Sequence, residues 1–155
     1  MAYSFSGRVR YSEIGENGLL TLPGILNYFQ DCSTFQSEQL GYGMDVLKKE
    51  KKAWVLAYWQ VIVKRYPKLC ERITVGTFAS GFKGMFGNRN FYMKDESGEQ
   101  IACANSIWVY MDVEKGKPVR VDKEQAEAYG IDEPLEMPYA VSYTHLRAHE
   151  TDQYL

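Results

Sequence analysis

Residues 21–41 form the one long stretch of this chain whose pattern predicts a helix. Thr21 can cap its start, and Pro23 falls in the first turn, where a missing N–H costs nothing. The side chains expected on the inward face recur at three- and four-residue spacing: Leu22, Ile25, Leu26, Phe29, Cys32 and Gln36. Gly41 lies where a left-handed residue often ends a helix. A helix with one mostly apolar face must cover another element, and that requirement constrains the rest of the chain.

The remaining segments up to residue 113 are patterned mainly as strands. Residues 3–11 alternate, whereas residues 53–66 are almost continuously apolar, which predicts a strand covered on both faces. Further strands are expected at 72–83, 86–94, 100–113 and 119–121, and short helices at 44–50 and 123–129. This order predicts an α+β hotdog fold, in which an antiparallel sheet of five or six strands wraps around one long helix. The alternative is an unrelated sandwich of a helix and a sheet.

The chain of 155 residues is predicted to hold one domain, residues 1–140, followed by a foreign tail, residues 141–155. Pro134 and Pro138 mark a linker, and the run SYTHLRAHET resembles a translated sequencing adaptor. The alternative is an ordinary C-terminal tail. Function is therefore sought in residues 1–140.

Composition excludes several classes of function. The net charge of −2, without a basic run interleaved with aromatics, argues against nucleic-acid binding. The absence of a run of about 18 apolar residues argues against a membrane span. Three widely spaced cysteines predict reduced thiols and a cytoplasmic location. Twelve Tyr, seven Phe and three Trp fit either a large aromatic core or a cleft for an apolar ligand.

Candidate catalytic groups are few, because both histidines, His145 and His149, lie in the doubtful tail. Without histidine in the body, no Ser–His or Cys–His pair and no metal site is expected, and no glycine-rich loop predicts a nucleotide cofactor. A carboxylate in an apolar cleft can act as a general base on water. The low-ranking candidates are Glu16, Asp31 and Glu38, and the competing interpretation is a turn and a solvated helix face.

Four segments, in order and spacing, resemble the N-terminal half of bacterial acyl-ACP thioesterases and, more weakly, the plant enzymes that end fatty acid synthesis. They are VRYSEIGENGLLTLPGILNYFQDCSTFQSEQLG, KAWVLAYWQVIVKRYPKLCERITVGT, FKGMFGNRNF and ANSIWVYMDVEKGKPVRV. The resemblance covers roughly residues 3–140. It implies a double hotdog that hydrolyses fatty acyl thioesters of acyl carrier protein, without a cofactor. The catalytic Asp, Asn and His motif of the family belongs to its second hotdog, and nothing in this sequence matches it.

By the same resemblance, the first hotdog contributes to the acyl pocket. Candidate substrate-binding residues are Ile25, Leu26, Phe29, Trp54 and Trp59, and packing alone explains them equally well. Lys83 and Arg89 are expected on a turn that meets the acidic carrier protein, and the competing interpretation is a solvated turn. The fragment is expected to hydrolyse little or nothing by itself and to self-associate or form a homodimer. Two alternatives stay open: a non-catalytic acyl-binding hotdog, and a homodimeric acyl-CoA thioesterase with a helix carboxylate as base.

Overall fold

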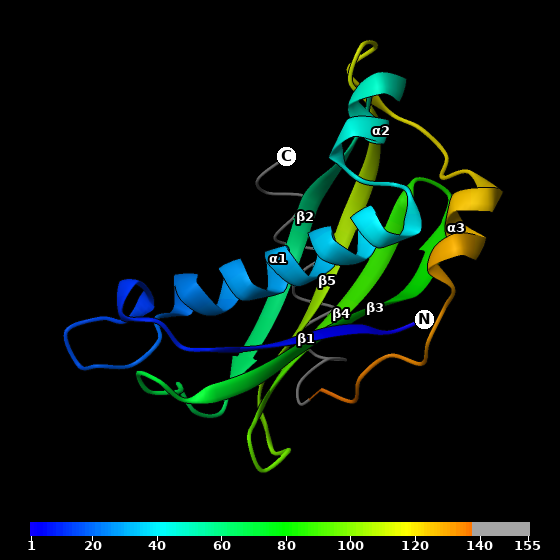
Figure 1. Ribbon diagram of the computed structural model, residues 1–155. Helices are drawn as coiled ribbons and strands as arrows, with labels where there is room; N and C mark the ends of the chain where they lie inside the picture. The colour runs from blue at the N-terminus through cyan, green and yellow to red at the C-terminus, as the bar shows by residue number, and fades with distance from the viewer. Residues whose placement is uncertain (138–155) are drawn as a thin grey trace, which may run out of the picture.

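A curled antiparallel sheet carries one long helix across its inner face (Figure 1). The computed structural model describes residues 1–137, so the predicted tail and its two histidines lie outside the described part. The strands are β1 (Tyr3–Arg8), β2 (Lys52–Val63), β3 (Arg72–Lys83), β4 (Phe86–Asp95), β5 (Gln100–Asp112) and β6 (Lys117–Pro118). Their order is β1-β3-β4-β5-β2, and β6 pairs with β5. The helices are α1 (Leu22–Leu40), α2 (Met44–Glu50) and α3 (Lys123–Tyr129). This arrangement is the predicted hotdog fold.

The long helix α1 begins and ends where the sequence predicted. The Thr21 hydroxyl accepts a hydrogen bond from the Gly24 N–H at 3.1 Å, which satisfies one free donor of the first turn. Gly41 ends the helix with φ of 84°, a conformation that costs glycine little. Leu22, expected on the inward face, is exposed instead, because the first helical turn lies at the rim of the sheet (Figure 1).

The core lies between the middle of α1 and the inner face of the sheet. Phe29 is completely buried and stacks on Phe91, with ring centroids 5.1 Å apart, and on Trp59 at 6.4 Å. Ile25 and Cys32 extend this contact along the helix. Burial of such side chains contributes about 1.5–3 kcal/mol each, so this cluster holds the helix against the sheet.

The first strand is shorter than its alternating pattern suggested. It ends at Arg8, and Tyr11 lies in a single 3₁₀ turn with 81% of its surface exposed. The reason is local hydrogen bonding. The Glu13 carboxylate accepts from the Arg10 N–H at 2.8 Å and from the Tyr28 hydroxyl at 2.6 Å, which turns the chain toward α1.

The apolar strand β2 lies at an edge of the sheet, and the alternate residues Val55 and Ala57 on one of its faces are exposed, which corrects the prediction that both faces are covered. It pairs only with β5, and Val55 is 48% exposed. A continuous apolar run is typical of a covered strand, but the position of a strand in the sheet decides what covers it. The strand predicted at residues 119–121 lies earlier, at Lys117–Pro118, although the Val119 N–H still donates to the Tyr110 carbonyl of β5 at 2.9 Å. The pairing of β3 with β4 contains a bulge between Ala79 and Gly81.

The described helices set one further limit. Within residues 1–137, no helix is both long enough and apolar enough to cross a membrane.

Candidate functional site

Along one face of α1, the side chains change midway from large and apolar to small, which leaves a pocket. Ile25, Phe29, Ser33 and Ser37 are four residues apart and therefore lie above one another on the same face. The first two are large and fill the core, whereas the two serines are small. The space between helix and sheet is consequently left open beside Ser33 and Ser37, where larger side chains would have filled it.

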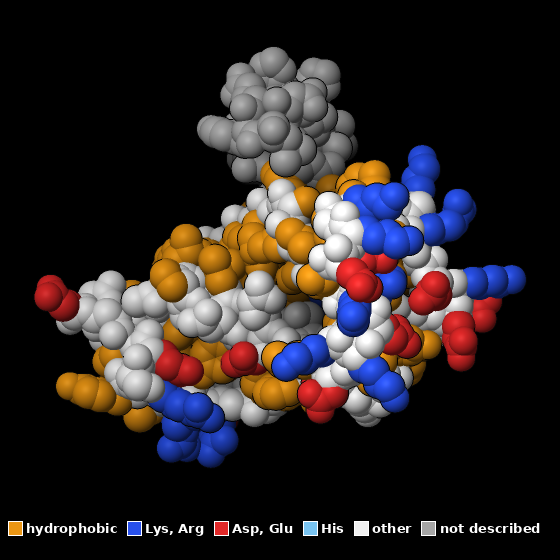
Figure 2. All heavy atoms as spheres, turned by 90° about the horizontal axis from the view of Figure 1, so that it is seen from above, with side chains coloured by type: hydrophobic (Ala, Val, Ile, Leu, Met, Phe, Trp, Pro, Cys, Tyr) orange, Lys and Arg blue, Asp and Glu red, His pale blue; other side chains and the backbone are white. Residues whose placement is uncertain are grey.

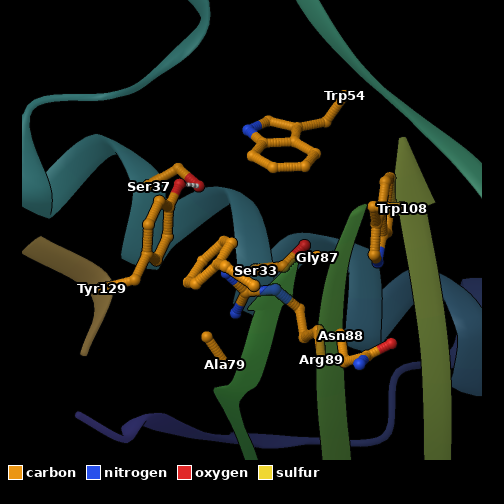
Figure 3. Close-up of a pocket in the computed structure, with 10 residues that line it drawn as sticks. Ser33, Ser37, Trp54, Ala79, Gly87, Asn88, Arg89, Trp108 and Tyr129 are labelled. Atoms are coloured by element: carbon orange, nitrogen blue, oxygen red, sulfur yellow. Dashed lines mark hydrogen bonds between the residues drawn. The ribbon is translucent and has the colours of Figure 1, made fainter. Parts of the chain in front are cut away.

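The far wall of the pocket comes from four strands and α3 (Figure 3). Besides the two serines, its lining residues are Trp54, Ala79, Phe82, Gly87, Asn88, Arg89, Trp108 and Tyr129, and the cavity volume is about 70 Å³. Gly87 allows the rings to approach, because a Cβ there would lie 3.2 Å from Phe82 and 3.3 Å from Trp54. The pocket therefore combines aromatic walls with several polar groups, as small-molecule sites do.

The pocket leads into a wide groove of about 790 Å³ between α1, α2 and the edge strand β2. Both cavities share Ser33, Ser37, Trp54 and Trp108, so a molecule lying in the groove can extend one end into the pocket. Lysines 48, 51 and 52 also line the groove. Figure 2 shows Lys and Arg side chains, interspersed with Asp and Glu side chains, toward the end of the molecule that carries α2 and α3. Asp45 and Glu114 line the groove as well, and Lys51 forms an ion pair with Glu114 at 3.6 Å. The entrance therefore carries charges of both signs, whereas most of the inner wall is apolar.

Arg89 brings a charged group into the pocket from β4 (Figure 3). Its Nη1 donates to the Gln36 Oε1 at 2.6 Å and to the Thr77 Oγ1 at 2.9 Å, and its Cζ lies 5.3 Å from the Tyr129 ring centroid. Burial lowers the pKa of this guanidinium, although an arginine stays protonated at neutral pH. Among residues 1–137, no carboxylate forms an ion pair with it.

The polar groups of the pocket are suited to binding and not to hydrolysis. The Ser37 and Tyr129 hydroxyls share a hydrogen bond of 2.6 Å, and the Ser33 hydroxyl donates to the Gln30 carbonyl at 3.0 Å. No Asp, Glu or His of residues 1–137 lines the pocket. A serine without a neighbouring base is a weak nucleophile, so the described pocket lacks the parts of an activated nucleophile.

The nearby thiol of Cys32 is equally unsuited to catalysis. Burial raises the pKa of Cys32 to about 12, and its Sγ lies 3.5 Å from the Val75 carbonyl oxygen, to which it donates. A thiolate is the reactive form of cysteine. This side chain is therefore a core residue at neutral pH.

The predicted substrate-binding residues fall into two groups. Trp54 lines both the pocket and the groove. Ile25, Phe29 and Trp59 belong to the core or pack against it, and Leu26 is half-buried beside it. With no surface open to a ligand, Ile25 and Phe29 can affect a bound chain only by setting the spacing between helix and sheet.

The predicted carboxylate bases lie away from the pocket. Asp31 is exposed on the outer face of α1, and Glu16 is exposed in the turn before it. The Glu38 carboxylate accepts from the Met44 N–H at 3.0 Å, at the start of α2. Each position fits the structural interpretation that the sequence left open, and a catalytic role for any of them remains a prediction.

The two predicted carrier-protein contacts are far from equivalent. Lys83 is exposed at the end of β3, where a partner can reach it. Arg89 is not on a turn, which corrects the expected position. It lies within β4, and its guanidinium is held inward by Gln36 and Thr77.

Sequence patterns alone missed most of the pocket. Ser33, Ser37 and Tyr129 were not identified, and Arg89 was assigned to the outside. One signal was present in the sequence: the helical row that begins with Ile25 and Phe29 continues with two serines. Small residues within an otherwise large apolar row predict a local gap in the packing.

The fold and pocket define a hotdog protein with a cavity between its helix and its sheet. A profile of the acyl-ACP thioesterase N-terminal domain matches residues 2–129. The chain therefore belongs to the acyl-ACP thioesterase family. The sequence resemblance to this family is confirmed.

The relatives are longer than this chain, and each match covers only part of the relative. A chloroplastic acyl-[acyl-carrier-protein] hydrolase of Cuphea viscosissima is 28% identical over 125 residues, 75% of this chain and 30% of the relative. A chloroplastic oleoyl-acyl carrier protein thioesterase of Arabidopsis thaliana is 26% identical over 128 residues, 78% of this chain and 35% of the relative. The crystal structure of an acyl-ACP thioesterase from Bacteroides thetaiotaomicron is 25% identical, with a TM-score of 0.79, and the match covers 88% of this chain and 57% of that one. The chain thus spans about a third of the length of the curated relatives that it matches.

Proposed function

We propose that this chain is the acyl-binding half of an enzyme that hydrolyses fatty acyl thioesters of acyl carrier protein in fatty acid synthesis. The observation that carries the proposal is the family match over residues 2–129, which covers the strands and helix that build the pocket. The acyl chain would lie along the groove, against the aromatic side chains that the groove shares with the pocket between α1 and the sheet. Contact with aromatic walls of this kind stabilises a bound acyl chain, because each methylene group removed from water contributes about 0.8 kcal/mol.

The hydrolytic residues are proposed to lie in a second hotdog domain. Two features support this division. The pocket has no Asp, Glu or His from residues 1–137, and the Bacteroides thetaiotaomicron enzyme is longer than the matched part. General base catalysis needs a titratable group within hydrogen-bond reach of the attacking water. This half would therefore hold the chain, and the other half would activate the water.

Acyl carrier protein is the proposed partner, and charge is the main support. Lysines 48, 51 and 52 line the groove, and Lys83 is exposed at the end of β3. These lysines would attract an acidic carrier protein and would speed association more than they add affinity, and Asp45 and Glu114 in the same groove reduce this attraction. A cytoplasmic location remains a prediction, and the plant relatives above are named chloroplastic.

We propose that a second hotdog covers the outer edge of β2 by pairing with this strand. β2 has twelve residues, is mostly apolar and exposes Val55, and no other strand of residues 1–137 pairs with its outer edge. A long apolar edge strand readily pairs with another chain. The purified 155-residue chain should therefore self-associate, and a clean monomer in sedimentation at high concentration would count against this proposal.

A hydrolysis assay tests the division of labour. The purified chain is incubated with acyl-ACP and, separately, with acyl-CoA, and release of the free thiol is followed. We expect little or no turnover from this chain alone. Turnover on the order of 1–10 s⁻¹ would show that the chain carries its own catalytic residues.

The same assay separates the two alternative functions. If hydrolysis is found, the variants Glu16→Ala, Asp31→Ala and Glu38→Ala test the carboxylate mechanism of a homodimeric thioesterase. Activity that survives all three changes rules that mechanism out. Binding of acyl thioesters without turnover, even when the full-length protein is assayed, would identify a non-catalytic acyl-binding hotdog.

A further inference from the structure

The guanidinium of Arg89 is a half-buried positive charge that lines the pocket, and it forms no ion pair with a carboxylate among residues 1–137. Both Nη1 donors are used by Gln36 and Thr77, which are neutral. The acceptors are themselves fixed, because the Gln36 amide donates to the Met1 carbonyl at 2.6 Å and the Thr77 hydroxyl donates to the Asn90 carbonyl at 2.9 Å. The arginine is therefore held in place at the pocket wall by a small network.

The remaining donors of Arg89 are available to a ligand. Its Nε and Nη2 donate to no residue among 1–137. Buried charges in proteins are normally paired, and a guanidinium presents a planar fork that matches a carboxylate. Tyr129 adds a ring face to one side of the cation and compensates only part of its lost hydration.

The surroundings of Arg89 limit the ligand to an anion carried by an apolar chain. Trp54 and Trp108 belong to both the pocket and the groove, so a chain that lies against them reaches the guanidinium with one end. A methyl end placed there would leave the charge unpaired and would remove its water. A carboxylate at the same point would pair with the cation.

We propose that the pocket is a carboxylate subsite, in which Arg89 binds a carboxylate at the end of an alkyl chain that lies against Trp54 and Trp108. The proposal rests on the proposed function and specifies the ligand class of the same pocket. The carboxylate has two possible sources. It is either the fatty acid that hydrolysis releases, or the far carboxyl group of an acyl chain that is still attached to its carrier.

Titration of the 155-residue chain with matched eight-carbon probes tests the proposal. Tryptophan fluorescence reports binding, because Trp54 and Trp108 line the pocket. Octanoate is expected to bind at least tenfold more tightly than methyl octanoate, a difference of about 1.4 kcal/mol. Equal affinity of the acid and the ester would overturn the proposal, as would binding of inorganic phosphate as tight as that of octanoate.

A third probe, monomethyl octanedioate, distinguishes the two sources. It carries a carboxylate at one end and an ester at the other. If monomethyl octanedioate binds as tightly as octanoate, the result supports the far carboxyl group of an acyl chain as the source, because the ester end must then be tolerated outside the pocket. Binding of octanoate alone supports the released acid.

Two variants connect the preference to the residue. Arg89→Met keeps the approximate length of the side chain and removes the charge, and it should abolish the preference for octanoate. Arg72→Met removes an exposed arginine charge at the start of β3, away from the pocket, and should leave the preference unchanged. If Arg89→Met does not fold, as judged by circular dichroism, the probe comparison on the native chain still decides. A folded Arg89→Met variant that still prefers octanoate would overturn the proposal. That result would leave the proposed thioesterase function standing, because acyl-ACP hydrolysis by the full-length enzyme is a separate measurement.

Discussion

The substitution Phe29→Ala tests whether the middle of α1 is core or ligand wall. The side chain has 0% of its surface exposed and packs between two aromatic rings, at 5.1 Å from Phe91 and 6.4 Å from Trp59. Removing a buried phenyl ring costs about 3–5 kcal/mol, because both burial and packing are lost and a cavity remains. For a chain of this size, each kcal/mol lowers Tm by about 2–4 °C, so the expected decrease is about 6–20 °C.

Urea unfolding followed by circular dichroism measures this loss. The matched control is Phe35→Ala, because Phe35 lies on the same helix but is 44% exposed, and its main ring contact is Phe5 at 5.2 Å. The control should lose about 1 kcal/mol or less. A Phe29→Ala variant that loses less than about 1 kcal/mol would refute the assignment of this residue to a tightly packed core.

Three further predictions concern the cap of α1, the thiols and a surface ion-pair network. Thr21→Ala should lower the free energy of unfolding by about 1 kcal/mol, measured in urea, because the first turn loses its cap. Iodoacetamide should modify exposed Cys70 and spare Cys32 in the native protein, since burial raises the pKa of the Cys32 thiol to about 12; equal labelling by mass spectrometry would contradict this. The hydrogen bond from Arg65 lowers the pKa of Glu71, so its stabilisation is present above the ordinary pKa of Glu and is lost as pH falls. The stability difference between native protein and Arg65→Ala should therefore shrink below about pH 4, and a constant difference would argue against this coupling.

Elements with a complete local signal were predictable from the sequence. The predicted helix at residues 21–41 has a capping threonine, a repeating inward face and a terminal glycine, and the structure confirms α1 with both caps. The strand at residues 72–83 and the short helix at residues 123–129 were also predicted within their observed bounds. In each case the information lies within one segment, so no knowledge of the rest of the fold is needed.

Features that depend on the order of strands were not predictable in the same way. The apolar pattern of β2 suggested a covered strand, but the sheet places it at an edge. Its apolar residues are explained if a second domain covers that edge. A single segment carries no information about such a partner. The early end of β1 depends on Glu13 meeting Tyr28, a contact between two elements.

The candidate site was predicted only in outline. A pocket against α1 was expected, and Trp54 was named as part of it. Arg89 was placed on the outside, because charged residues are usually exposed and the sequence does not reveal on which face of β4 it lies. Its inward position follows from the pairing of β4 with β3 and from the hydrogen bonds to Gln36 and Thr77, which join residues distant in the sequence.

The most direct test of the central claim is to locate a bound acyl chain. A fatty acyl probe with a diazirine on its chain is incubated with the 155-residue protein, irradiated and mapped by mass spectrometry. The account predicts crosslinks to the shared walls of pocket and groove, chiefly Trp54 and Trp108, and their loss on competition with unlabelled fatty acid. Crosslinks confined to the outer face of α1, around Asp31, would contradict the assignment of this chain as the acyl-binding half.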